Sequence, residues 1–129
     1  MSKKIKFEQE YLFKTSLKVL NNMVTTPSGL SEWFADDVNI KDDIYTFSWD
    51  GSEESARLLK KKANEFIRFR WLEDEEEGID SYVEMNFKVD PMTKEVVFNL
   101  TSFAYEDELE ENQLYWESTI NELKRVLGA

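Results

Sequence analysis

The chain has 129 residues, of which 41% are hydrophobic, and it contains neither histidine nor cysteine; its net charge is −11 at pH 7. This length and apolar content predict one domain that folds around its own core. The missing side chains exclude the usual zinc sites and catalytic triads, and the negative charge argues against binding to nucleic acid or to an anionic membrane surface.

Neither a membrane span nor a signal peptide is predicted. No apolar run approaches the roughly 20 residues that a transmembrane helix needs. The basic start Met-Ser-Lys-Lys-Ile-Lys-Phe alternates at once and has no apolar h-region. We therefore expect a cytoplasmic protein with no membrane insertion, metal or cofactor.

The first third of the chain predicts a strand followed by two short helices. Residues 4–11 alternate between apolar or polar and charged side chains, as in a strand with one buried face. Thr15 or Ser16 can cap a first helix, and Pro27 suits the first turn of a second one. The apolar side chains expected on the inner faces of the two helices are Leu17, Leu20, Val24, Leu30, Trp33 and Phe34.

The middle of the chain predicts a series of antiparallel strands. Asp50-Gly51 is a strong hairpin signal, and Pro91 lies in a predicted turn at 90–94. The strands are predicted at 36–41, 44–50, 52–63, 65–72, 82–89 and 95–104. The side chains expected to face inward are Tyr45, Phe47, Trp49, Ile67, Phe69, Trp71, Val83, Met85, Phe87, Val89, Phe98 and Leu100.

Two acidic segments in the second half of the chain have different predicted structures. The run at 73–77, closed by Gly78, predicts a solvated loop. Residues 107–127 predict a long helix that begins with a capping box from Asp107 to Glu110 and ends before Gly128. The apolar stripe of this helix consists of Leu109, Trp116, Ile120, Leu123 and Leu127.

This order of elements resembles the helix-grip fold of the START-like (SRPBCC) superfamily, which includes the Bet v 1 allergens and the Aha1-type activators of the Hsp90 ATPase. The similarity to the Aha1-type domains is carried by the segment 26–34, which ends in Trp33-Phe34, by the Asp50-Gly51 turn before the aromatic strand 66–71, and by Trp116. The resemblance implies a single START-like domain over residues 1–129, of class α+β. Its curved antiparallel sheet of about six to seven strands has two short helices after the first strand and a long C-terminal helix packed across it.

The aromatic side chains between sheet and helix fit two interpretations: an ordinary packed core, or the lining of a cavity that holds a ligand. The polar groups that would orient such a ligand are Arg70, Asn99, Thr101, Ser102 and Gln113. The candidate cavity residues are Trp33, Phe34, Phe47, Trp49, Phe69, Trp71, Met85, Phe87, Phe98, Leu100, Trp116 and Ile120.

The expected function is that of a non-catalytic protein that holds a small apolar or amphipathic, lipid-like ligand in a cavity between the sheet and the C-terminal helix. The alternative is a protein-interaction module that resembles the Hsp90 activators and binds a chaperone or another protein through its acidic surface. The carboxylate pairs Asp36-Asp37 and Asp42-Asp43 predict solvated turns, so no enzyme activity is expected.

Overall fold

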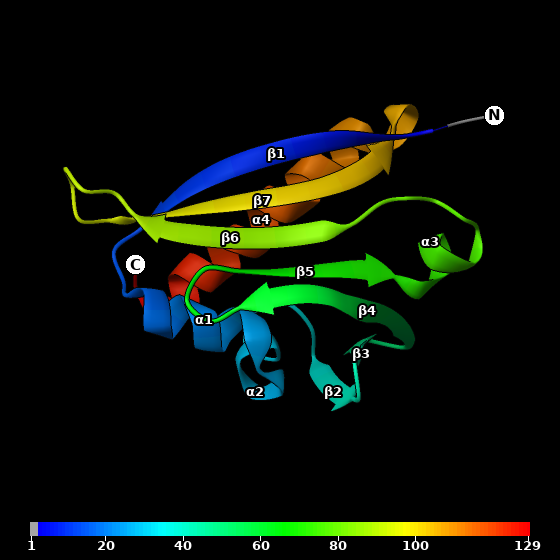
Figure 1. Ribbon diagram of the computed structural model, residues 1–129, viewed down its shortest axis with the longest axis horizontal. Coiled ribbons are helices and arrows are strands. Elements are labelled where there is room, and N and C mark those ends of the chain that lie inside the picture. Colours follow the sequence, from blue (N-terminus) through cyan, green and yellow to red (C-terminus); the bar gives the residue numbers. More distant parts are fainter. Residues whose placement is uncertain (1–2) are drawn as a thin grey trace.

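The computed structural model describes residues 3–129, which form one seven-stranded antiparallel sheet in the order β1-β7-β6-β5-β4-β3-β2 (Figure 1). Strands β2 to β7 pair with their neighbours in the chain, and β1 pairs with β7, so that the first and last strands lie side by side. The strands are β1 (Lys4–Phe13), β2 (Asp37–Lys41), β3 (Ile44–Trp49), β4 (Ser52–Lys62), β5 (Phe66–Trp71), β6 (Val83–Val89) and β7 (Val96–Tyr105).

The predicted helices occur in the predicted order, and a short helix at 72–76 and a 3₁₀ turn at 106–108 are added to them. The long C-terminal helix crosses one face of the sheet, while α1 lies beside the start of β5 and the end of β6, and α2 packs against α1 and β2 (Figure 1). The fold is the predicted α+β helix-grip arrangement. Its helical segments are α1 (Leu17–Thr25), α2 (Pro27–Leu30), α3 (Leu72–Glu76), the 3₁₀ turn η1 (Glu106–Glu108) and α4 (Leu109–Leu127).

Several turns and helix ends form where the sequence predicts them. The Ser16 hydroxyl accepts a hydrogen bond from the Val19 amide at 3.1 Å and caps α1. Trp49 pairs with Ser52 across the Asp50-Gly51 turn, where Gly51 has a φ of 80° that favours glycine. At the far end of the chain, Gly128 adopts the left-handed conformation and its amide donates to the Arg125 carbonyl.

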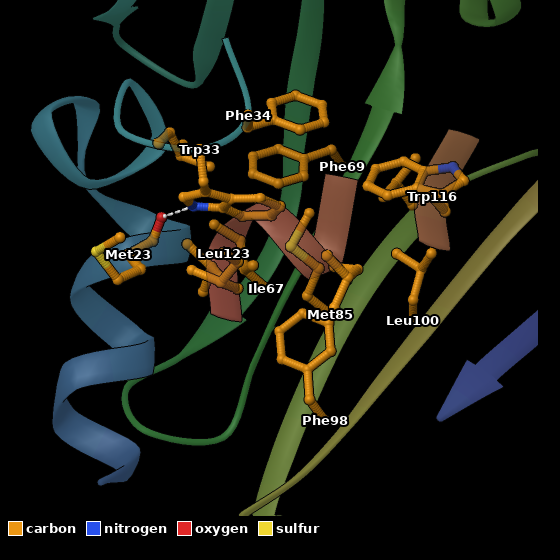
Figure 2. Packing of buried hydrophobic residues seen from close by; sticks show 14 of the residues in the cluster. Met23, Trp33, Phe34, Ile67, Phe69, Met85, Phe98, Leu100, Trp116 and Leu123 are labelled. Atoms are coloured by element: carbon orange, nitrogen blue, oxygen red, sulfur yellow. Dashed lines mark hydrogen bonds between the residues drawn. The ribbon is translucent and has the colours of Figure 1, made fainter. Parts of the chain in front are cut away.

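The core lies between the sheet and α4. Trp116, Ile120 and Leu123 of α4 are buried against side chains of the central strands, among them Met85 and Leu100 (Figure 2). This is the middle part of the stripe predicted for the helix, and its two ends, Leu109 and Leu127, are partly buried beside it.

The segment after α2 enters this core with two large rings. The Trp33 indole N–H donates to the Met23 carbonyl at 2.8 Å (Figure 2). The Phe34 ring stacks on Trp116 with centroids 5.6 Å apart and meets Phe47 edge-on at 5.0 Å. Phe34 therefore ties the α2 segment to both the sheet and the C-terminal helix.

The acidic run predicted as a loop is mostly helical, and this prediction was wrong. Residues 72–76 form α3, with Glu73, Asp74 and Glu75 in its first turn, where the helix dipole favours negative charge. Asp74 is buried rather than solvated. The charge pattern suggested repulsion, but a buried ion pair compensates one of the carboxylates.

Three further expectations differ from the structure. The second helix ends at Leu30, so Trp33 and Phe34 lie in the turn that follows it. The capping box at Asp107 does not form, because residues 106–108 make a 3₁₀ turn and α4 begins without a side-chain cap. Val89 was expected to face inward but is 44% exposed, because it ends β6 beside the turn at 90–94.

Gly29 lies where α1 and α2 come together, and a methyl group there would stand 2.1 Å from the Asn22 carbonyl oxygen and 2.7 Å from the Met23 Cα. Since both neighbours are backbone atoms, Gly29→Ala should lower the free energy of unfolding by about 2–3 kcal/mol. Urea denaturation measures this loss. The exposed neighbour provides the control, since Ser28→Ala should change stability little; equal effects of the two substitutions would contradict the close approach.

Candidate ligand-binding site

A hollow of about 250 Å³ opens at the end of the core, between α4, α3 and the β3–β4 hairpin. Its walls combine aromatic rings with a few polar and charged side chains. We call it the aromatic hollow. The lining residues are Lys4, Phe34, Trp49, Glu54, Trp71, Glu73, Asp74, Ser102, Phe103, Asn112, Tyr115 and Trp116.

Tryptophan side chains from three elements form the apolar wall together with Phe34. The Trp49 ring meets Phe34 edge-on with centroids 5.5 Å apart, and its indole N–H donates to the Phe34 carbonyl at 2.7 Å. Trp116 stacks on the same ring. Trp71, at the end of β5, is only partly buried, like Trp49. Rings held in this way offer both faces and edges to a ligand.

An ion pair closes the hollow on its polar side. The Lys4 ammonium of β1 donates to both carboxylate oxygens of Asp74, at 2.8 and 2.9 Å. The two side chains are only 18% and 5% exposed. The Ser81 hydroxyl donates to the same carboxylate. These bonds tie α3 to the first strand, although Lys4 and Asp74 lie 70 residues apart in the sequence.

A second hollow, of about 460 Å³, lies beyond this ion pair. The two hollows share five lining residues, which are Lys4, Glu73, Asp74, Phe103 and Asn112. We call the second one the acidic hollow, because its lining adds the carboxylates of Glu77 and Glu108 and also includes Ala104 and Tyr105. The ion pair therefore stands in the wall common to both.

Helix α3 is also held from the side of the sheet. The Arg57 guanidinium of β4 donates to Glu75 at 2.8 Å and to Asp43 at 3.2 Å. Hydrogen bonding to Arg57 lowers the pKa of Glu75 below its ordinary value. On α4, partial burial raises the pKa of the Tyr115 phenol, and the Glu54 charge acts in the same direction. Glu54 and Tyr115 both line the aromatic hollow.

The centre of the core, in contrast, is filled. The space between Phe34, Phe69 and Met85 amounts to about 10 Å³. This is too small for any organic ligand, since ligand pockets usually measure about 300–1,000 Å³. Larger spaces along the candidate residues lie away from this centre: the aromatic hollow, and an open surface depression of about 310 Å³ beside Trp33, Phe34 and Trp49.

The structure divides the predicted cavity residues into three groups. Phe34, Trp49, Trp71 and Trp116 line the aromatic hollow. Phe34, Phe47, Phe69, Trp71 and Met85 surround the small central void. Phe87, Phe98, Leu100, Ile120 and Trp33 lie in the buried cluster and line neither of these spaces.

Of the polar candidates, only Ser102 lines the aromatic hollow. Arg70 is bound to Asp80 and to the Ser81 carbonyl, and Asn99 donates to Asn86 at 3.4 Å. Sequence reasoning missed Lys4, Asn112 and Tyr115. The signal available for Lys4 was weak, because it belongs to an ordinary alternating strand and its partner lies 70 residues away.

Two general features concern residues 3–129. None of their helices is long and apolar enough to cross a membrane. In the same part of the chain, no three acidic side chains are placed to hold a metal ion.

The chain belongs to the START-like superfamily, since the family model for the START-like superfamily domain matches residues 1–129. The Bacteroides fragilis protein BfR322 is 32% identical over 97% of this chain and 92% of its own, with a TM-score of 0.68. No curated protein matches the sequence. Members of this superfamily commonly bind ligands, which is the general role that the family supports.

More distant structures share the fold. The Aha1 dimer from Colwellia psychrerythraea has a TM-score of 0.80 at 14% identity, with 93% of each chain covered. DynU16, a putative protein in the dynemicin biosynthetic locus, has a TM-score of 0.79 at 12% identity, covering 96% of this chain and 47% of its own. At these identities the likeness shows the fold alone.

The ion pair between Lys4 and Asp74 leads to a prediction about stability. Lys4→Met leaves the buried Asp74 carboxylate without its cation and should lower the free energy of unfolding by about 2–3 kcal/mol. Urea denaturation at neutral pH measures the loss. Lys6→Met provides the control, because its ion pair with Glu8 is largely exposed and should matter much less. A loss no larger than the control's would show that the pair does not anchor α3.

Proposed function

We propose that this protein is a non-catalytic binding protein for a small amphipathic molecule, and that the ligand occupies the aromatic hollow at the end of the core. One observation carries the proposal: the rings of Trp49, Trp71 and Trp116 border a hollow of about 250 Å³, while the centre of the core is filled. A stable domain normally closes such apolar surface by packing.

The charged groups near the hollow support binding rather than catalysis. Asp74 is held by Lys4 and Ser81, so its oxygen atoms are committed to structural bonds. General acid–base catalysis needs a group that reaches the reacting proton and exchanges it near neutral pH. The chain contains no histidine, and the remaining carboxylates of the lining, Glu54 and Glu73, are exposed.

The alternative function, protein interaction through an acidic surface, has less support. It rests on the net charge of −11 and on the likeness to Aha1, which at 14% identity concerns the fold. The hollow therefore carries the proposal.

The proposal predicts ligand-dependent stabilisation that a filled hollow abolishes. Fractions of a lipid and metabolite extract should include one that raises the melting temperature by several degrees, since a ligand at 100 times its Kd adds about 2.7 kcal/mol. Asn112→Phe places a bulky ring at a position that lines both hollows, and this variant should no longer respond. Thermal-shift measurements test both statements.

The matched control is Asn121→Phe, which makes the same substitution at an exposed position of the same helix. It should respond as the unmodified protein does. If no fraction stabilises the protein, or if Asn112→Phe still responds fully, the proposed binding site is wrong.

A further inference from the structure

The two hollows carry a strong excess of negative charge. Lys4 is the only basic residue in the lining of either hollow, and Asp74 binds its ammonium with both oxygens. The other charged lining residues are all carboxylates: Glu54, Glu73, Glu77 and Glu108. Among residues 3–129, none of these four forms an ion pair. A ligand therefore meets more carboxylates than cations in the lining, and this excess favours a positively charged group.

The aromatic walls also favour a positively charged ligand. The face of a tryptophan ring is negative and attracts ammonium groups within about 6 Å of its centre. The hollow contains Trp49, Trp71 and Trp116, together with Tyr115. One such contact already exists within the chain, since the Lys4 ammonium lies 5.3 Å from the centre of the Tyr105 ring, which lines the acidic hollow.

The two hollows are arranged in series. The rings line the one next to the core, and Glu73, which lines both, leads to Glu77 and Glu108 in the other. A ligand whose apolar part lies in the aromatic hollow would thus extend its other end into the acidic hollow. A carboxylate or phosphate head group would meet these glutamates without a free basic partner, and like charges repel.

We propose that the ligand is an amphipathic cation: an amine or quaternary ammonium whose apolar body lies among the tryptophans and whose positive group faces Glu73 and Glu108. The inference rests on the proposed function and narrows it to one ligand class. Anionic amphiphiles such as fatty acids are excluded as preferred ligands.

Three probes with the same chain and different head groups separate the two proposals. Octyltrimethylammonium, octanol and octanoate are titrated into the protein at low ionic strength, below their aggregation concentrations, and binding is followed by calorimetry and tryptophan fluorescence. The ammonium should bind about tenfold more tightly than octanoate, with octanol in between. If none of the three binds, the proposed function fails; if octanol or octanoate binds as tightly as the ammonium, only the inference fails.

A pair of double variants tests whether the preference comes from the site. Glu73→Gln with Glu108→Gln should reduce the preference for the ammonium over octanol about threefold or more. Glu76→Gln with Glu111→Gln removes the same charge close by, from α3 and from the first turn of α4, at positions that line neither hollow. This control should keep the preference. An equal loss in both double variants would assign the effect to the net charge of the protein and overturn the inference.

Discussion

The stack of Phe34 on Trp116 is the contact on which the arrangement of this domain depends. Phe34 comes from the turn after α2 and Trp116 from the middle of α4, and the same phenylalanine meets Phe47 and Trp49 of β3. Three parts of the chain that are distant in sequence are therefore fixed at one point. The aromatic hollow lies along the edge of this cluster, since Phe34, Trp49 and Trp116 all line it.

The side chains pack differently on the two sides of the Phe34–Trp116 contact. Toward the centre of the sheet the side chains leave a void of about 10 Å³, as a close-packed core does. Toward the first turns of α4, the helix contributes Asn112 and the half-exposed Tyr115 rather than aliphatic groups. Here α3 closes the wall, held by Lys4 from β1 and by Arg57 from β4. The fold thus combines a rigid interior with an open end whose polar side is an ion pair.

Most of the fold could be predicted from the sequence, because its signals are local. Alternation along the strands, the Asp50-Gly51 turn and the Gly128 cap each act within a few residues. The helix α3 could not, since its stability depends on Asp74 meeting Lys4, 70 residues away. The capping box failed for a local reason: residues 106–108 continue from β7 in a 3₁₀ turn, which moves the start of α4 to Leu109.

The sequence predicts which kinds of side chain form the candidate site, but not where the space between them lies. The sequence identifies the rings that gather between sheet and helix, and all twelve candidates lie in the core cluster or against it. It does not determine which of them leave space, because a void depends on how neighbouring side chains interlock. Trp49, Trp71 and Trp116 border the hollow, whereas Phe98 and Leu100 are fully buried. The carboxylates that line the two hollows are recognisable in the sequence as charged residues, but their grouping around these hollows depends on the tertiary structure.

The indole N–H signals of the four tryptophans offer the most direct test. In an NMR titration with whichever octyl probe binds most tightly, the signals of Trp49, Trp71 and Trp116 should shift, since these side chains line the aromatic hollow. Trp33 lines neither the aromatic nor the acidic hollow, so its signal should move least. A Trp33 shift as large as that of Trp116, or saturation without any indole shift, would contradict the assignment of the ligand to this hollow.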